Sequence, residues 1–358
     1  MTRELLIGTR KGLFTLRGDG DGPYQVAGRA FDGNVVEYAM RDPRSGRYFA
    51  SVTSGFYGPR LWHSMDPTAP AEAWTHAETL AMPEDTGASL ARIWVVRAGE
   101  GDGQLWAGVD PAALFESRDG GLTWELNRAL WDQPGREDWQ PGGGGLCLHS
   151  IATWPGAPEK LSLGISAVGY WRTDDRGVSW EKVGKGIDAR YLPEEVRETS
   201  SDHCVHNLHR APQRPERLFM QFHGGVYRSD DDGDTWTSIA DGLPSDFGFP
   251  IAGDPADPDS AFVIPMTADV DRVTVGGAVA VYETRDAGAS WTARDQGLPS
   301  GDAYLTVLRQ AFDADGEGDG LGLWFGATSG EVFGSVDAGR SWFTVAPRLA
   351  PVTSVRVA

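Results

Sequence analysis

Short apolar and aromatic runs, separated by turns rich in glycine and aspartate, recur along the whole chain. Five of these runs lead into the same eight-residue motif, [ST]-x-D-x-G-x-[ST]-W, which begins at residues 117, 173, 229, 284 and 335. Successive copies are therefore 51 to 56 residues apart. A repeat of this length with strand-like content predicts stacked β units of the kind that form propeller blades.

The conserved positions of the motif have structural explanations. The aspartate can accept hydrogen bonds from backbone amides ahead of it and so close a turn. The glycine can adopt a positive φ without steric cost, and the tryptophan offers a large surface that can wedge between sheets. We therefore predict that the five motif aspartates are structural and not catalytic. They are Asp119, Asp175, Asp231, Asp286 and Asp337.

Two degenerate copies, at residues 13–24 and 64–74, precede the five and bring the number of units to seven. The chain starts with a strand-like segment at 4–9 and ends with another at 352–357. We predict an all-β fold, a single seven-bladed β-propeller domain spanning 1–358, with the C-terminal strand closing the ring in the N-terminal blade and removing open sheet edges. The inner strands are expected at 35–41, 92–97, 146–154, 205–212, 250–253, 304–311 and 352–357.

Composition narrows the classes of partner. The formal net charge of −19 argues against nucleic acid and anionic membranes. No apolar run is long enough to span a bilayer, and the N-terminus lacks the apolar core of a secretory leader. Two cysteines, Cys147 and Cys204, make no disulfide framework. We expect a cytoplasmic protein that binds a small molecule or a glycan, and the sequence leaves its oligomeric state open.

Loop lengths indicate where the ligand site lies. In a four-stranded blade the motif joins the third and fourth strands, so the connections between blades lie on the opposite face. Two of those connections, 128–145 and 185–204, are long and flank the fourth blade. Long loops in a compact domain are often functional. We therefore expect the site at the channel mouth near blades four and five.

Five of the seven histidines fall between residues 149 and 223. Cys147-Leu148-His149 and Cys204-Val205-His206 occupy matching positions one repeat apart, and His223 ends the second strand of blade five. We predict that His149, His206 and His223 converge at the mouth. They can hold a divalent metal such as zinc, with Cys147 or Cys204 as a further ligand, or act in acid–base catalysis. The remaining interpretation is that they are packed polar groups between blades.

Other candidates lie on loops of the same face. Asp246 is expected to be catalytic, and the neighbouring Phe247 is expected to be a stacking platform. The expected substrate-binding residues are Arg10, Arg92, Trp139, Gln221, Phe247 and Arg272. Further carboxylates that can take part in glycosidic hydrolysis are Asp110, Glu137, Asp138, Asp202 and Asp271.

The repeated motif resembles the Asp-box, or BNR repeat, of sialidases and related propellers. The whole chain is similar to bacterial BNR-repeat proteins labelled as glycosyl hydrolases or exo-sialidase-like, and the matching segments are 8–14, 144–151, 204–206, 221–236 and 243–250. The resemblance implies a hydrolase. Sialidases are usually six-bladed and carry Arg-Ile-Pro before the first box, whereas Arg92-Ile93-Trp94 lacks the proline.

Three function classes therefore stay open. The first is a sialidase-like glycoside hydrolase that acts on a small polar or glycan substrate at the channel mouth. The second is a metal-dependent hydrolase or lyase with histidine ligands. The third is a non-catalytic binding or assembly scaffold.

Overall fold

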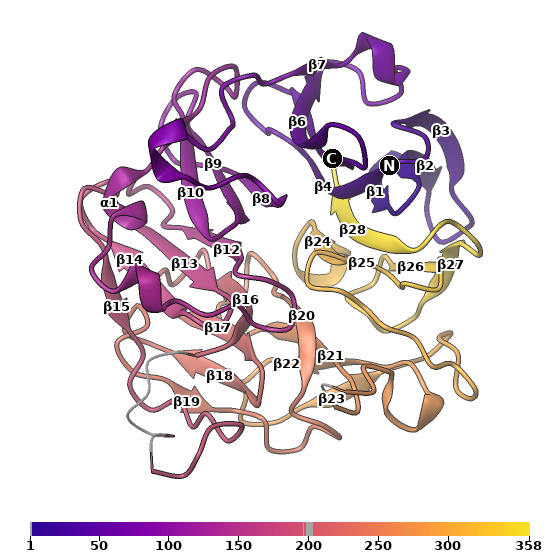
Figure 1. The fold of residues 1–358 in the computed structure, drawn as a ribbon. Helices are drawn as coiled ribbons and strands as arrows, with labels where there is room; N and C mark the ends of the chain where they lie inside the picture. The colour runs from indigo at the N-terminus through magenta and orange to yellow at the C-terminus, as the bar shows by residue number, and fades with distance from the viewer. Residues whose placement is uncertain (1, 196, 198–202, 269) are drawn as a thin grey trace.

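The computed structural model describes residues 2–195, 197, 203–268 and 270–358. Seven four-stranded antiparallel sheets stand around a central axis as the blades of a propeller (Figure 1). The predicted seven-bladed, all-β architecture is confirmed. In every blade but the first, the chain runs from the inner strand to the outer strand.

Blades one to four come from the N-terminal half and the C-terminal strand. Blade one consists of β28 (Val352–Val357), β1 (Thr2–Thr9), β2 (Gly12–Asp19) and β3 (Gln25–Ala30). Blade two consists of β4 (Val35–Arg41), β5 (Tyr48–Ser54), β6 (Gly58–Ser64) and β7 (Thr75–His76). Blade three consists of β8 (Arg92–Ala98), β9 (Leu105–Asp110), β10 (Ala113–Ser117) and β11 (Glu125–Leu126). Blade four consists of β12 (Leu148–Thr153), β13 (Leu161–Ile165), β14 (Gly169–Thr173) and β15 (Glu181–Val183).

Blades five to seven complete the ring. Blade five consists of β16 (Val205–Arg210), β17 (Leu218–Phe222), β18 (Gly225–Ser229) and β19 (Thr237–Ser238). Blade six consists of β20 (Gly248–Ala252), β21 (Ala261–Pro265), β22 (Val281–Thr284) and β23 (Thr292–Arg294). Blade seven consists of β24 (Phe312–Asp315), β25 (Gly322–Gly326), β26 (Val332–Ser335) and β27 (Phe343–Ala346). The helices are α1 (Arg128–Trp131) and the 3-10 turns η1 (Ala71–Ala73), η2 (Glu84–Thr86), η3 (Arg136–Asp138), η4 (Val275–Gly277) and η5 (Gly318–Gly320).

The two ends of the chain close the ring together. Strand β28 pairs with β1 in an antiparallel register that runs from Leu5 opposite Val357 to Thr9 opposite Val352. The N- and C-termini consequently lie close to each other in blade one (Figure 1). The predicted closure by the C-terminal strand is confirmed.

The predicted inner strand at 304–311 is wrong, because the inner strand of blade seven begins at Phe312. The apolar residues Leu305 and Val307 are buried, which explains the strand-like pattern. Their segment, however, bonds to loops: Thr274 N donates to Leu305 O and Thr328 N donates to Thr306 O. The hydrophobic pattern of 304–311 therefore reflects burial beneath a neighbouring loop. It does not reflect pairing within a β-sheet.

The five repeated turns have the same hydrogen bonds. In each, the backbone N–H of the seventh residue donates to the aspartate Oδ1 at 2.9 Å. The glycine N–H donates to the hydroxyl of the first residue. The indoles of Trp180, Trp291 and Trp342 reach the preceding blade and donate to Asn127 Oδ1, Ile239 O and Arg294 O. These three turns therefore join blades four, six and seven to the blade before each.

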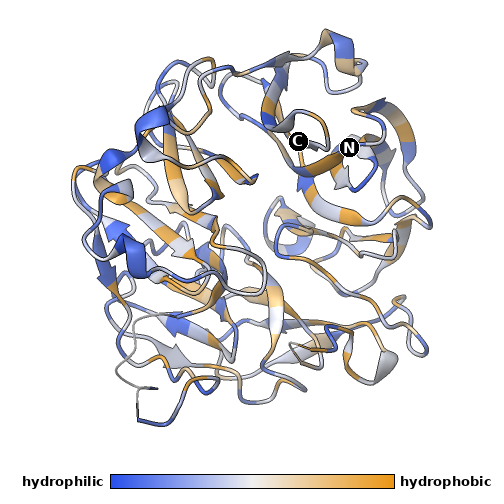
Figure 2. Ribbon diagram, viewed as in Figure 1, coloured by the Kyte–Doolittle hydropathy of each residue, from blue (hydrophilic) through white to orange (hydrophobic). Residues whose placement is uncertain are grey.

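Burial follows the strands of each sheet. Hydrophobic positions lie mainly within the strands, and hydrophilic positions gather in the connecting loops (Figure 2). The largest continuous core cluster packs blade seven against blades one and six and includes the fully buried Trp324. Among the residues described, no helix is both long and apolar enough to cross a membrane.

We predict that Asp175→Ala lowers the free energy of unfolding by about 1 kcal/mol at pH 7, because an exposed turn loses its central acceptor. Hydrogen bonds from the Ser179 hydroxyl and N–H and from the Thr173 hydroxyl lower the pKa of Asp175 to about 2. The folded pKa lies below the ordinary value, so this stabilisation is complete above about pH 4 and is lost as the pH falls toward 2.

Urea denaturation at several pH values measures this effect. The matched control is Asp174→Ala, because the neighbouring Asp174 carboxylate is largely exposed and lies 3.8 Å from Lys160. The Asp175 variant should differ from wild type at pH 7 and match it near pH 2. A difference that persists unchanged at pH 2, or an equal effect at Asp174, contradicts the assignment.

Candidate functional site

A β-bulge at the start of most inner strands shapes the channel mouth. In six of the seven blades, the pairing register between the inner strand and the second strand shifts once, at an equivalent position. Bulges re-aim side chains and are common next to active sites. The extra residues at this level are Glu37, Trp94, His149, His206, Phe249 and Thr353.

Hydrogen bonds across the ring form a floor below this level. The Gln310 side chain, from the segment before β24, donates to His149 O at 2.7 Å, and the Asn207 side chain donates to Arg309 O at 2.9 Å. A cavity of about 290 Å³ adjoins these hydrogen bonds and is lined by His149, Asn207 and Gln310 among others. Of the three predicted histidines, His149 therefore lines this cavity, whereas His206 and His223 do not.

His149 belongs to the floor. Its Nε2 lies 3.0 Å from Val205 O and its Nδ1 lies 2.9 Å from the Ser150 hydroxyl. Burial lowers the pKa of His149 well below the ordinary value for histidine. The ring is fully buried and both nitrogens have protein partners, so the structure does not bring His149 into a ligand cluster with the other two histidines.

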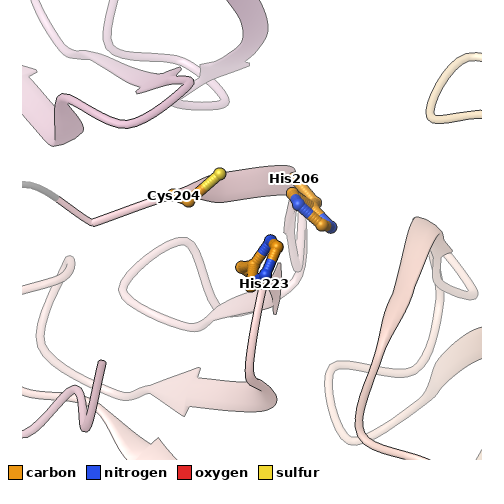
Figure 3. Close-up of side chains that lie close together, drawn as sticks. All are labelled: Cys204, His206 and His223. Carbon is orange, nitrogen blue, oxygen red and sulfur yellow. The ribbon is translucent and has the colours of Figure 1, made fainter. Parts of the chain in front are cut away.

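Cys204, His206 and His223 form the cluster (Figure 3). One ligand atom from each lies within 4.8 Å of the others. Cys204 immediately precedes β16, His206 lies near the beginning of that strand, and His223 follows the end of β17. The backbone hydrogen bond from His223 N to Cys204 O, at 3.1 Å, holds the two segments together. Two imidazoles and a thiol are donors that zinc accepts.

A backbone carbonyl fixes the orientation of His206. Its Nδ1 lies 2.6 Å from Gly248 O, and a carbonyl can only accept, so Nδ1 carries the proton and Nε2 keeps its lone pair. This is the arrangement by which proteins orient metal-binding histidines. Burial, followed by the charge of Arg309, lowers the pKa of His206 well below its ordinary value.

Aromatic rings enclose the two histidines. The ring centroids of His206 and His223 are 5.3 Å apart, and Phe249 lies 4.7 Å from His206. Phe247 contacts both histidines with centroid distances of 5.5 Å and is only 5% exposed. Phe247, expected as a stacking platform, is therefore a buried wall of the cluster. Tyr191 covers His223 from the other side at 4.9 Å.

The predicted substrate-binding residues are distributed unevenly. Arg92 forms a 3.1 Å ion pair with Glu37 and stacks on Trp94 at the mouth. Arg272 lies over Phe249 at 5.5 Å. Arg10 is an exposed residue of the loop between β1 and β2, where its charge lowers the pKa of Glu37 against the larger raising effect of burial. These three arginines lie on the expected face.

Three other predicted residues do not present free groups to the mouth. The Gln221 amide is buried and donates to Phe222 O, Gly225 O and Asp246 O, so it braces the loop before β20. Trp139 packs on Trp171 of β14 at 5.4 Å. The Asp246 carboxylate is 42% exposed and lies 3.7 Å from Arg190.

Among the other predicted carboxylates, Asp110 is the one that lies at the mouth. Burial raises its pKa, and the glycine run 142–145 passes directly over it, because a Cβ at Gly145 would meet its Oδ2. Glu137 and Asp138 are exposed on η3, and Asp271 is exposed before Arg272. Asp202 lies outside the described residues.

The sequence analysis missed Arg309 and Trp94. Arg309 lies inside the segment wrongly predicted as a strand, and Trp94 occupies the place where the sialidase pattern has a proline. The recurring Cys-x-His spacing did point to Cys204. A signal for Trp94 and Glu37 was available in the alignment of the inner strands, since each occupies the position of His206 in its own blade.

Comparisons with known proteins agree on the fold. No family model matches the chain. A xyloglucanase from Paenibacillus sp. is 25% identical over 82% of this chain and 31% of its own length. The crystal structure of an ancestral GH74 enzyme superposes with a TM-score of 0.58 at 15% identity, covering 98% of this chain and 40% of that one.

A third similar structure is YCF48 from Cyanidioschyzon merolae, with a TM-score of 0.55 at 14% identity over 89% of this chain and 87% of that one. This chain spans about a third of the length of the xyloglucanase and two fifths of the GH74 enzyme. The chain is therefore a seven-bladed propeller that is similar to part of a xyloglucanase and of a GH74 enzyme.

Proposed function

We propose that this protein is a metal-dependent hydrolase whose site is the channel mouth beside blades four and five. One observation carries the proposal: the ligand atoms of Cys204, His206 and His223 lie within 4.8 Å of one another. Three protein ligands around zinc leave a fourth position for water, which the metal makes nucleophilic near neutral pH. The similarity to a xyloglucanase and to a GH74 propeller supports a glycan end or a similar small polar molecule as the substrate.

The residues around the cluster have complementary roles in this proposal. The Gly248 carbonyl accepts from His206 Nδ1, so Nε2 is the nitrogen that would bind a metal. The buried rings of Phe247 and Phe249 shield His206 from water, and the Tyr191 ring contacts His223. Asp110, whose pKa is raised by burial, retains a proton to a higher pH than an ordinary carboxyl and is the candidate donor to a leaving group.

A glycoside hydrolase that uses two carboxyl groups without a metal is the second candidate. It is favoured by the raised pKa values of both Asp110 and Glu37, each caused mainly by burial, on either side of Arg92. In this alternative the paired carboxyls carry out the acid–base chemistry. The metal-dependent mechanism needs Cys204, His206 and His223, whereas the two-carboxyl mechanism does not. One assay therefore distinguishes them.

The assay measures hydrolysis of aryl glycosides, xyloglucan oligosaccharides and small esters by protein as purified, after chelation and after addition of zinc. We expect hydrolysis to fall by at least about 100-fold on chelation and to return with zinc. Hydrolysis that resists chelation but is lost in Asp110→Asn establishes the two-carboxyl alternative. A zinc-loaded protein that hydrolyses none of these substrates argues for a binding scaffold and against both proposals.

A further inference from the structure

The Arg309 guanidinium lies in the channel mouth, and no hydrogen bond joins it to another described residue. Its Nε is fully enclosed and donates no hydrogen bond, and none of the ion pairs between described residues includes Arg309. Its neighbours are aromatic faces: the Phe249 ring centroid is 5.0 Å away and that of Trp94 is 5.7 Å away. Burial lowers the pKa of Arg309, the nearby Cys147 and Cys204 oppose this effect, and the positive charges of Arg272 and Arg92 add to it.

A second orphan group lies beside it. The indole N–H of Trp94 is also enclosed and has no hydrogen-bond partner. An arginine and an indole can only donate, so a ligand group that binds here is an acceptor.

Arg356 shows how the same ring satisfies an arginine that serves structure. It lies below the floor, and its Nε donates to the Tyr38 hydroxyl at 2.9 Å while its Nη1 donates to Gln310 O at 2.9 Å. In the part of the chain that the structure describes, no group accepts a hydrogen bond from the Arg309 Nε. The fold supplies hydrogen-bond acceptors to Arg356 but not to the Arg309 Nε. Arg309 is therefore the arginine that can bind a ligand.

The glycine run above Arg309 leaves room for that ligand. A Cβ at Gly144 would lie 3.5 Å from the Arg309 Nη1, and one at Gly143 would lie 3.5 Å from an Arg272 nitrogen. Gly142 at the start of the run lies against Cys204. The run therefore spans from the cluster to the orphan guanidinium, and side chains there would fill the space between them.

We propose that Arg309 binds a carboxylate of the substrate, held between the Trp94 and Phe249 rings beneath residues 142–145 and next to the Cys204, His206 and His223 cluster. A planar guanidinium matches a carboxylate with two parallel hydrogen bonds. The identity of this carboxylate as part of the substrate rests on the proposed hydrolase. The binding of the anion does not, because it needs only Arg309 and its surroundings.

Thermal unfolding and calorimetry with acetate, acetamide and inorganic phosphate test the inference, each on chelated and on zinc-loaded protein. We expect acetate to bind and raise the unfolding midpoint, and acetamide to have no effect. Arg309→Met should weaken acetate binding by at least about 10-fold, while Arg309→Lys should retain part of it. The matched control is Arg60→Met, because Arg60 stacks on the exposed Tyr57 of blade two.

Three results overturn the inference. Acetate binding that is unchanged in Arg309→Met places the anion elsewhere. Phosphate binding as tight as acetate binding assigns the site to a free inorganic anion. Loss of zinc from Arg309→Met without loss of acetate binding shows that the guanidinium serves the metal cluster. Acetate binding by chelated protein that never takes up zinc leaves this inference standing while the metal proposal fails.

Discussion

Replacing His206 with alanine is expected to lower the zinc affinity of the protein by at least about 100-fold and to lower hydrolysis in parallel. The variant loses the ligand that is oriented by Gly248 O, and loss of an orienting partner alone typically costs 10- to 100-fold. Competition with a chromophoric chelator measures the affinity. His223→Ala provides a second variant, since His223 is only partly buried and its removal disturbs the core less.

Cysteine supplies the control for this experiment. Cys204→Ser should lower zinc affinity, whereas Cys147→Ser, at the matching position one blade earlier, should not. The Cys147 thiol is fully buried, and burial raises its pKa to about 12, so it stays a neutral packing group. Equal losses in the two serine variants, or full affinity in His206→Ala, contradict the metal cluster.

Removing residues 352–358 is expected to abolish cooperative folding. The deletion takes away strand β28 with its buried Val352 and Val355, leaves the β1 edge unpaired, and removes the Arg356 hydrogen bonds to Tyr38 and Gln310. Together these losses amount to more than about 5 kcal/mol. That is comparable with the whole stability of an ordinary domain, about 5–15 kcal/mol.

Circular dichroism and urea denaturation measure this outcome. The control deletion removes Ala358 alone, which costs one hydrogen bond from its N–H to Glu4 O at 3.0 Å and should change stability little. A chain without 352–358 that still unfolds cooperatively at the wild-type midpoint contradicts the role given to the closing strand.

The repeat carries most of the fold in the sequence. Each turn needs an aspartate that accepts hydrogen bonds, a glycine with positive φ and a tryptophan that packs between sheets. These residues therefore recur at every such turn, and five copies predict the blades and their spacing. Closure by the last strand follows from the half-units at the two ends. The inner strand of blade seven was misplaced because Leu305 and Val307 are buried under a loop, and burial alone does not distinguish a strand from a packed connection.

The site was only partly predictable. Matching positions in adjacent blades identified the region of Cys204, His206 and His223, because the repeat places equivalent residues at equivalent heights. His149 occupies the same height as His206, but its Nε2 donates to Val205 O and its Nδ1 is paired with the Ser150 hydroxyl, so neither nitrogen is free to bind a ligand. Such differences depend on which atoms of the neighbouring blade are nearby. Arg309 belongs to no sequence motif. Its proposed role rests on the structure, in which no described residue accepts a hydrogen bond from its Nε.

X-ray absorption at the zinc edge of the purified protein tests the central claim most directly. We predict about one zinc per chain with one sulfur at about 2.3 Å and two nitrogens at about 2.0–2.1 Å, and loss of this signal when Cys204, His206 and His223 are replaced together. Zinc that is absent after reconstitution, that has only oxygen ligands, or that keeps its signal in the triple variant contradicts the metal site at the channel mouth.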